Sequence, residues 1–229
     1  MNFKALIFDL DGTLLNTLED IANSMNTVLT RHGFFARGLS DYRNFVGDGV
    51  EMLVKRLLRE GNQDTETLRA FVEEYREEYN QNWNVLTRPY DGVAETLDAL
   101  SARHIKLAIL SNKPHDFTYK CVMEFLPHWD FDMVLGQGGG IPLKPDPTGA
   151  LKIAEFMNLL PESILYVGDT DVDMKTAIAA GMYPVGALWG FRSMEELKHN
   201  GARVLIDRPQ EILTLADKEN HQTDIRPLQ

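Results

Sequence analysis

The chain has 229 residues, of which 44% are hydrophobic and 25% charged, so it is long enough for one large globular domain or a domain with an insert. Acidic residues outnumber basic residues by 34 to 23, and the formal net charge of -11 argues against nucleic acid or an anionic membrane as the main partner. An anionic substrate would need a local positive charge or a metal ion to hold it.

The first apolar run, Ala5 to Phe8, predicts a buried strand that ends on Asp9, with a second carboxylate at Asp11. Residues i and i+2 of an extended segment point the same way, so these carboxylates are expected to lie side by side. Asp9 is then a candidate nucleophile toward phosphorus and Asp11 a candidate proton donor to the leaving oxygen. Gly12 would let the backbone turn closely under a phosphate. The alternative for Asp11 is an ordinary turn former.

Residues 17 to 82 carry stripes of apolar residues at helical spacing and no strand pattern. We predict an all-helical cap domain over residues 16–85, inserted after the first strand of a core that comprises residues 1–15 and 86–229. The loop from Val46 to Gly49 precedes the second stripe. Its amides could bind an anion such as a carboxylate at a helix N-terminus, or the loop could simply connect two helices, and the sequence favours neither.

From residue 93 onward the apolar patterns alternate between helix and strand. Helices are predicted at 93–100, 117–125, 148–157 and 172–180, and strands at 106–110, 131–135, 164–167 and 183–187. Alternation with almost continuously apolar strands indicates an α/β fold, a Rossmann-like parallel sheet with helices on both faces.

Polar residues follow these strands at the edge where open parallel sheets bind ligands. They are Ser111, Asn112 and Lys113 after one strand, Lys144 in the loop 142–147, and Asp169, Asp171 and Asp173 after another. Several acids in one place repel each other unless a cation lies among them, and oxygen ligands suit Mg²⁺. Taken singly, Ser111 could be an ordinary strand-ending hydroxyl and Lys144 a solvated charge. Asp171 most simply caps its helix, and we place Asp173 in a second shell that orients the metal ligands.

The arrangement resembles the haloacid dehalogenase superfamily. The resemblance rests on Asp9-Leu-Asp11-Gly-Thr13, on Ser111 after an apolar strand, on Lys144 before Pro145, and on Gly168-Asp169-xxx-Asp173. It implies a phosphatase in which Asp9 forms an aspartyl-phosphate, Asp11 is acid and base, and Ser111, Asn112 and Lys144 bind the phosphate. It also implies that Asp9, Asp169 and the Asp11 carbonyl hold Mg²⁺, under a mobile helical cap.

Alternatives within the superfamily differ at identifiable residues. A dehalogenase lacks the second acid present here as Asp11, and sugar phosphomutases of this kind carry a histidine that is absent from Thr17 to Ile21. A pyrophosphatase, a nucleotidase or a sugar-phosphate phosphatase stays open. A non-enzymatic phospho-receiver would need neither Asp11 nor the insert. The stretch Asn44 to Val50 is similar to that of bacterial phosphoglycolate phosphatases, which implies 2-phosphoglycolate as substrate.

Other expectations concern the chain's surroundings. The single cysteine, Cys121, cannot form an internal disulfide, and a free thiol fits a reducing compartment. We expect Cys121 to be a small buried apolar residue and not a nucleophile. No signal-peptide or membrane-span pattern is visible, so we expect a cytoplasmic protein that acts on a small anionic phosphorylated substrate without nucleic acid or membrane. A monomer and a homodimer both fit. The segment Trp189 to Arg192 could contact substrate or only pack.

Overall fold

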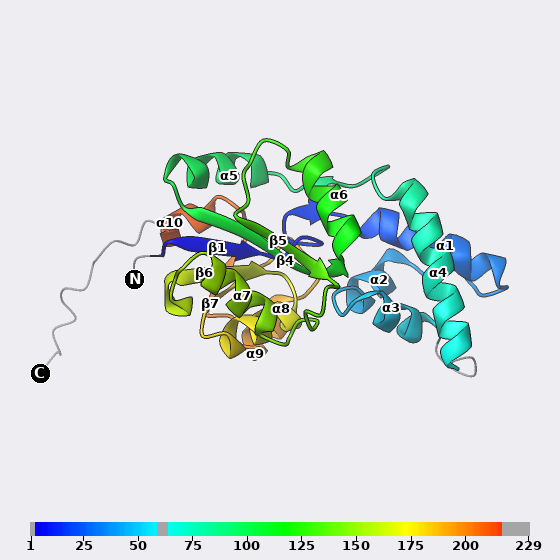
Figure 1. The fold of residues 1–229 in the computed structure, drawn as a ribbon. Helices are drawn as coiled ribbons and strands as arrows, with labels where there is room; N and C mark the ends of the chain where they lie inside the picture. The colour runs from blue at the N-terminus through cyan, green and yellow to red at the C-terminus, as the bar shows by residue number, and fades with distance from the viewer. Residues whose placement is uncertain (1–2, 59–63, 217–229) are drawn as a thin grey trace, which may run out of the picture.

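A computed structural model describes residues 3–58 and 64–216. Its centre is a six-stranded parallel sheet with the strand order β5-β4-β1-β6-β7-β8 (Figure 1). The strands are β1 (Ala5–Phe8), β4 (Lys106–Pro114), β5 (Met133–Gln137), β6 (Ile164–Gly168), β7 (Tyr183–Ala187) and β8 (Val204–Ile206). The predicted α/β fold with a parallel sheet is confirmed. In the described ranges, no helix is long and apolar enough to cross a membrane.

Helices cover both faces of the sheet because each central strand is apolar on both sides. In β1, Leu6 and Phe8 join one core cluster, whereas Ala5 and Ile7 join another. The first cluster includes residues of three helices, α5 (Val93–Ala102), α6 (His115–Phe125) and α10 (Glu211–Ala216). The second includes residues of α7 (Thr148–Phe156) and α8 (Asp171–Ala179). The helix α9 (Met194–His199) follows β7 on the α8 side (Figure 1).

Of the described helices between β1 and β4, all except α5 form a separate group beyond the carboxyl ends of the strands (Figure 1). They are α1 (Leu18–Arg31), α2 (Leu39–Phe45), α3 (Val50–Leu57) and α4 (Thr65–Asn82), and most of one hydrophobic cluster comes from them. The chain enters and leaves this group through an antiparallel pair of short strands, β2 (Leu15–Asn16) and β3 (Arg88–Pro89). The side chains of this helical layer therefore lie at the edge of the sheet where ligands bind.

Several elements differ from the predictions. Pairing between β4 and β5 resumes at Pro114 and Gln137 after an irregularity, so β4 runs past residue 110 and β5 lies two residues later than predicted. The helix α2 was not predicted because, of its seven residues, only Tyr42 is buried. The elements β8, α9 and α10 were also missed, since each has at most six residues and too short a pattern to read.

Candidate active site

Asp9 stands directly after β1, where its backbone N–H donates to the Val167 carbonyl at 2.9 Å and so continues the pairing with β6. Its side chain is 7% exposed. Its Oδ1 accepts from the Leu10 N–H at 2.7 Å and lies 2.9 Å from the Lys144 ammonium. Asp9 and Asp11 line the same pocket, as the spacing of the two residues predicts.

Asp169 follows β6 in a fully buried position that hydrogen bonds define closely. Its Oδ1 accepts from the Thr13 hydroxyl at 2.7 Å, and its Oδ2 accepts from the Phe191 N–H at 2.8 Å. Gly12 has a φ of +90°, and a β-carbon there would overlap the Asp169 carboxylate. Glycine is therefore needed at this position both for its backbone conformation and for the close approach.

Asp173 lies in the first turn of α8, where it forms a capping box with Thr170. Its Oδ2 accepts from the Thr170 N–H at 3.0 Å and from the Thr170 hydroxyl at 2.7 Å. Its Oδ1 accepts from the Lys144 ammonium at 2.7 Å. The ammonium thus bridges Asp9 and Asp173, and the structure brings Lys144 to the acids as the sequence predicts.

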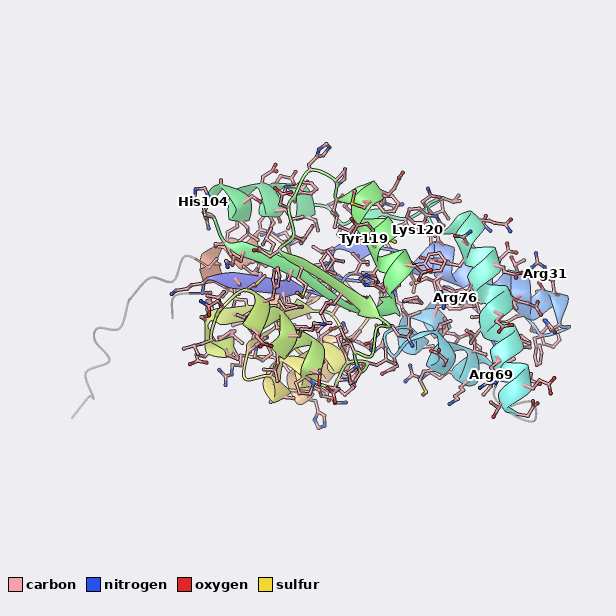
Figure 2. All side chains as sticks on the ribbon, viewed as in Figure 1. Arg31, Arg69, Arg76, His104, Tyr119 and Lys120 are labelled. Carbon is pink, nitrogen blue, oxygen red and sulfur yellow. The ribbon has the colours of Figure 1, made fainter. Side chains whose placement is uncertain are left out.

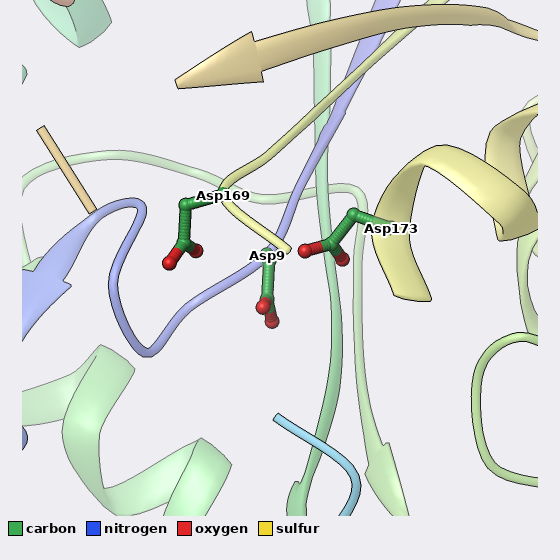
Figure 3. Close-up of side chains that lie close together, drawn as sticks. All are labelled: Asp9, Asp169 and Asp173. Carbon is green, nitrogen blue, oxygen red and sulfur yellow. The ribbon is translucent and has the colours of Figure 1, made fainter. Parts of the chain in front are cut away.

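Ligand oxygens of Asp9, Asp169 and Asp173 lie within 4.8 Å of one another, and all three residues are buried (Figure 3). When these acids are ionised, the single ammonium of Lys144 leaves two negative charges uncompensated. This donor set of buried carboxylate oxygens fits a hard divalent cation such as Mg²⁺. Asp11 is outside the cluster, and its predicted contribution is a backbone carbonyl. Asp173 is as close as the two predicted ligands, although Thr170 and Lys144 already occupy its oxygens.

The pKa values report the same crowding of negative charge. Burial raises the pKa of Asp9 from 3.8 to about 7, although the attraction of Lys144 opposes the rise. Burial, together with repulsion from Asp173 and Asp9, raises the pKa of Asp169 well above its usual range. Burial disfavours the charged form of Lys144, but the attraction of Asp173 and Asp9 outweighs it and holds the pKa of Lys144 above its ordinary value. Burial and mutual repulsion thus disfavour the charged forms of Asp9 and Asp169 when no cation is bound.

Ser111 and Asn112 lie in the last part of β4 and line the pocket. The Ser111 hydroxyl accepts from the Lys113 N–H at 3.3 Å. The Asn112 side chain donates to the Gly47 and Lys144 carbonyls, both at 3.0 Å, and accepts from the Lys144 N–H at 2.8 Å. With both amide protons engaged, the Asn112 side chain holds two loops in place and has no proton left for a phosphate.

Lys113 belongs to the site, where the sequence analysis placed it at the edge of the sheet without assigning it a role. Its ammonium lies 3.1 Å from each oxygen of the Asp11 carboxylate and 2.8 Å from the Tyr79 hydroxyl. Burial disfavours the charge on Lys113, but Asp11 and Tyr79 outweigh this effect and hold its pKa well above its ordinary value. One signal was available: Lys113 stands two residues after Ser111 in an extended segment, so both point to the same side.

The pocket above these residues has one polar wall and one mainly apolar wall. Its empty space, counting the part open to solvent, is about 610 Å³. The sheet side contributes Asp9, Asp11, Ser111, Asn112 and Lys113, and the helical layer contributes Ile21, Val50, Leu53, Tyr75 and Tyr79. Arg76, which projects from α4 (Figure 2), also lines it. Its guanidinium lies 3.2 Å from Asp116 of α6.

The segment Trp189 to Arg192 connects the sheet to the helical layer. The Trp189 indole N–H donates to the Thr13 carbonyl at 2.9 Å, and the Phe191 ring packs in the hydrophobic cluster of α1–α4. The Arg192 guanidinium donates to the Arg43 carbonyl and, at 2.8 Å, to the Val46 carbonyl. In the described residues, this segment packs and holds the helical layer in place, and it is absent from the pocket lining.

Comparisons with known proteins agree with this geometry. The model of the haloacid dehalogenase-like hydrolase family matches residues 6–187. A phosphoglycolate phosphatase from Aquifex aeolicus is 32% identical over 218 residues, which cover 95% of this chain and 98% of that protein. One from Nitrosospira multiformis is 32% identical over 223 residues, which cover 95% of this chain and 97% of that protein. The solved structure of a candidate phosphoglycolate phosphatase from Lactobacillus delbrueckii subsp. bulgaricus superposes with a TM-score of 0.88 at 28% identity, covering 96% of this chain and 100% of that one.

Proposed function

The chain belongs to the haloacid dehalogenase-like hydrolase family and is a phosphatase, and we propose that it hydrolyses 2-phosphoglycolate to glycolate and phosphate through an aspartyl-phosphate on Asp9. One observation carries the mechanism. Asp9, next to the Lys144 ammonium at 2.9 Å, shares a pocket with the second carboxylate, Asp11. A nucleophile, a cation for the phosphoryl oxygens and a proton donor are thus in one place.

In the first half-reaction, the Asp9 carboxylate attacks phosphorus while the bond from phosphorus to the ester oxygen breaks. The Leu10 N–H and the Lys144 ammonium both contact Oδ1 of Asp9, so we assign the attack to Oδ2. Asp11 donates its proton to the departing alkoxide, which leaves as an alcohol. The Lys144 ammonium and the Ser111 hydroxyl hold the phosphoryl oxygens, whose charge they stabilise in the transition state.

In the second half-reaction, the Asp11 carboxylate, now without its proton, accepts a proton from a water molecule. The oxygen of that water attacks phosphorus, and the bond from phosphorus to the Asp9 oxygen breaks. Phosphate leaves, Asp9 is again a carboxylate, and Asp11 again carries the proton for the next turnover. One side chain serves as acid and then as base because the two steps occur in sequence at the same place.

Mg²⁺ fits the buried cluster of carboxylates, and we propose that the side chains of Asp9 and Asp169 and the carbonyl of Asp11 hold it. Asp173 accepts a hydrogen bond from Thr170 and pairs with Lys144, and in the second shell it orients the groups that hold the ion. When bound, the ion neutralises negative charge on the phosphoryl group and on the acids around it. Asn112 acts as a positioning residue for the Lys144 loop, because its amide hydrogen-bonds both the N–H and the carbonyl of Lys144.

We further propose that residues 16–85 act as a cap that closes over the site and excludes bulk water. Side chains of α1, α3 and α4 line the pocket, and the paired strands β2 and β3 carry both connections to the core. Two cap carbonyls, those of Val46 and Gly47, accept hydrogen bonds from Arg192 and Asn112 of the core. These contacts support a closed arrangement in the structure.

The assignment of 2-phosphoglycolate rests on the named relatives, each matched over nearly the whole of both chains. The test is a panel of 2-phosphoglycolate, p-nitrophenyl phosphate, a sugar phosphate, a nucleoside monophosphate and pyrophosphate, assayed with Mg²⁺ and with EDTA. We expect repeated turnovers that need Mg²⁺ and the highest kcat/KM on 2-phosphoglycolate. A single burst of phosphate would indicate a phospho-receiver, and a preference for pyrophosphate or a nucleotide would overturn the substrate assignment.

Asp9→Asn is the matching test of the nucleophile. An amide cannot attack phosphorus, so kcat should fall by about a thousandfold or more. The exposed Asp130 offers a control, because Asp130→Asn changes the same functional group at a residue outside the pocket lining and should leave turnover unchanged. Retention of about a tenth of the wild-type rate by Asp9→Asn would contradict the assignment.

A further inference from the structure

Lys113 is a buried cation that the proposed reaction does not use. Its side chain is 4% exposed, and it lines the pocket. The ammonium lies 2.8 Å from the Tyr79 hydroxyl and 4.7 Å from the centre of the Tyr79 ring. The phosphoryl group already has a cation, because the Lys144 ammonium lies between Asp9 and Asp173. Lys113 adds a second buried ammonium to the pocket, next to Asp11, that can bind another group of the substrate.

The position of Lys113 matches the length of 2-phosphoglycolate. A general acid lies about 3 Å from the oxygen that it protonates, and the Lys113 ammonium lies 3.1 Å from both oxygens of Asp11. The ester oxygen and the ammonium are therefore at most about 6 Å apart. A carboxylate one methylene from the ester oxygen reaches about 3 Å from it, by standard bond lengths. A charge-assisted hydrogen bond of about 2.8 Å from the Lys113 ammonium to this carboxylate spans the remaining distance.

Other residues are poorer candidates for this carboxylate. Among described residues that line the pocket, Lys113 and Arg76 carry positive charge, and each is paired with an acid, Asp11 or Asp116. The side chain of Arg76 is 46% exposed, so solvent screens its charge, whereas that of Lys113 is 4% exposed. The loop from Val46 to Gly49, which the sequence suggested as an anion site, is fixed by hydrogen bonds that Arg192 and Asn112 donate to its carbonyls. These contacts explain the loop as an attachment of the helical layer to the core.

We infer that Lys113, supported by Tyr79, recognises a substrate carboxylate one methylene away from the phosphate ester. The site then selects phosphate esters of 2-hydroxy acids over uncharged esters of the same size. This inference rests on the proposed function and adds the residue that determines its specificity. Because Tyr79 belongs to α4 and Lys113 to β4, recognition requires the helical layer to be docked on the core.

The test compares 2-phosphoglycolate with 2-phosphoglycolamide, in which a neutral amide of the same size replaces the carboxylate. The quantity compared is the ratio of kcat/KM for the acid to kcat/KM for the amide. The wild type should favour the acid, and Lys113→Met should lower the ratio by about tenfold or more, since a hydrogen bond between charged groups is lost. Damage to Asp11 slows both substrates and cancels in the ratio. Lys113→Arg should keep most of the preference. Lys152→Met, which removes the same charge from an exposed position on α7, should leave the ratio unchanged.

An unchanged ratio in Lys113→Met would overturn the inference while the phosphatase assignment stands. If that variant does not fold, as judged by circular dichroism, the wild type alone decides. The phosphate ester of 3-hydroxypropionate carries its carboxylate one carbon further away and should be hydrolysed at least tenfold less efficiently than 2-phosphoglycolate, on the order of one lost charged hydrogen bond. Equal efficiency on the two acids would overturn the inference. No turnover of any ester, including p-nitrophenyl phosphate, would overturn the proposed function and this inference with it.

Discussion

Asp9→Asn should abolish catalysis and yet stabilise the metal-free protein. Asp9 is 5% exposed and lies near the charges of Asp173 and Asp11 as well as that of Lys144. Burial raises its pKa from 3.8 to about 7, a value that already includes the opposing attraction of Lys144. The ionised form of Asp9 is therefore unfavourable in the folded protein, and asparagine has nearly the same shape without the charge.

The sign follows from proton binding. Between about pH 4 and 7 the folded protein keeps the Asp9 proton that the unfolded chain has lost. The contribution of Asp9 to the free energy of unfolding therefore falls as pH rises through this range and is constant above it. The pKa rise from 3.8 to about 7 spans about three pH units, at about 1.4 kcal/mol each. Asp9→Asn should therefore gain about 4 kcal/mol at pH 8 and about 2 kcal/mol at pH 5.5.

Urea unfolding in EDTA at both pH values measures this gain, with Asp130→Asn as the control for loss of an exposed carboxylate. If Mg²⁺ binds the folded wild type as proposed, it should narrow the gap, because a ligand at a hundredfold excess over its Kd stabilises the folded state by about 2.7 kcal/mol. A variant that is no more stable than the wild type at pH 8 in EDTA would refute the reasoning. A gain that does not depend on pH would show that the Asp9 charge is not its cause.

Three further substitutions test other parts of the site. Asp11→Asn should slow the hydrolysis of alkyl phosphates more than that of p-nitrophenyl phosphate, whose leaving group needs little protonation. An equal loss of kcat on both substrates would show that Asp11 is not the general acid. Asp169→Ala should raise the Mg²⁺ concentration needed for half-maximal rate, and Ca²⁺ should inhibit the wild type, so an unaltered Mg²⁺ titration would place the ion elsewhere. Gly47→Val should reduce kcat/KM on 2-phosphoglycolate and p-nitrophenyl phosphate alike, because Gly47 has a φ of +129° and its β-carbon would lie 3.3 Å from the Thr170 methyl group. Loss confined to 2-phosphoglycolate would instead assign the carboxylate to this loop.

Much of the fold could be predicted because its signals are local. The apolar run from Ala5 to Phe8 and the alternation after residue 92 depend on residues that are neighbours in the chain. The carboxyl ends of parallel strands meet at one edge of a sheet. The sequence alone could therefore predict that the acids after β1 and β6 lie close together. The elements β8, α9 and α10 were not predicted because they are short and depend on packing against neighbouring elements for their stability.

The sequence by itself determined the order of the elements and the chemistry gathered at the edge of the sheet, because periodicity and strand ends are properties of the local chain. Only the tertiary structure decided which of these groups touch. The contact of Lys113 with Asp11 joins residues 102 apart in the chain, and its contact with Tyr79 joins residues 34 apart. Such pairings depend on how the helical layer docks on the sheet, and no local pattern encodes that docking. The same physical reason left the role of Trp189 to Arg192 open, because Arg192 reaches the Val46 carbonyl, 146 residues away, only after both parts have folded.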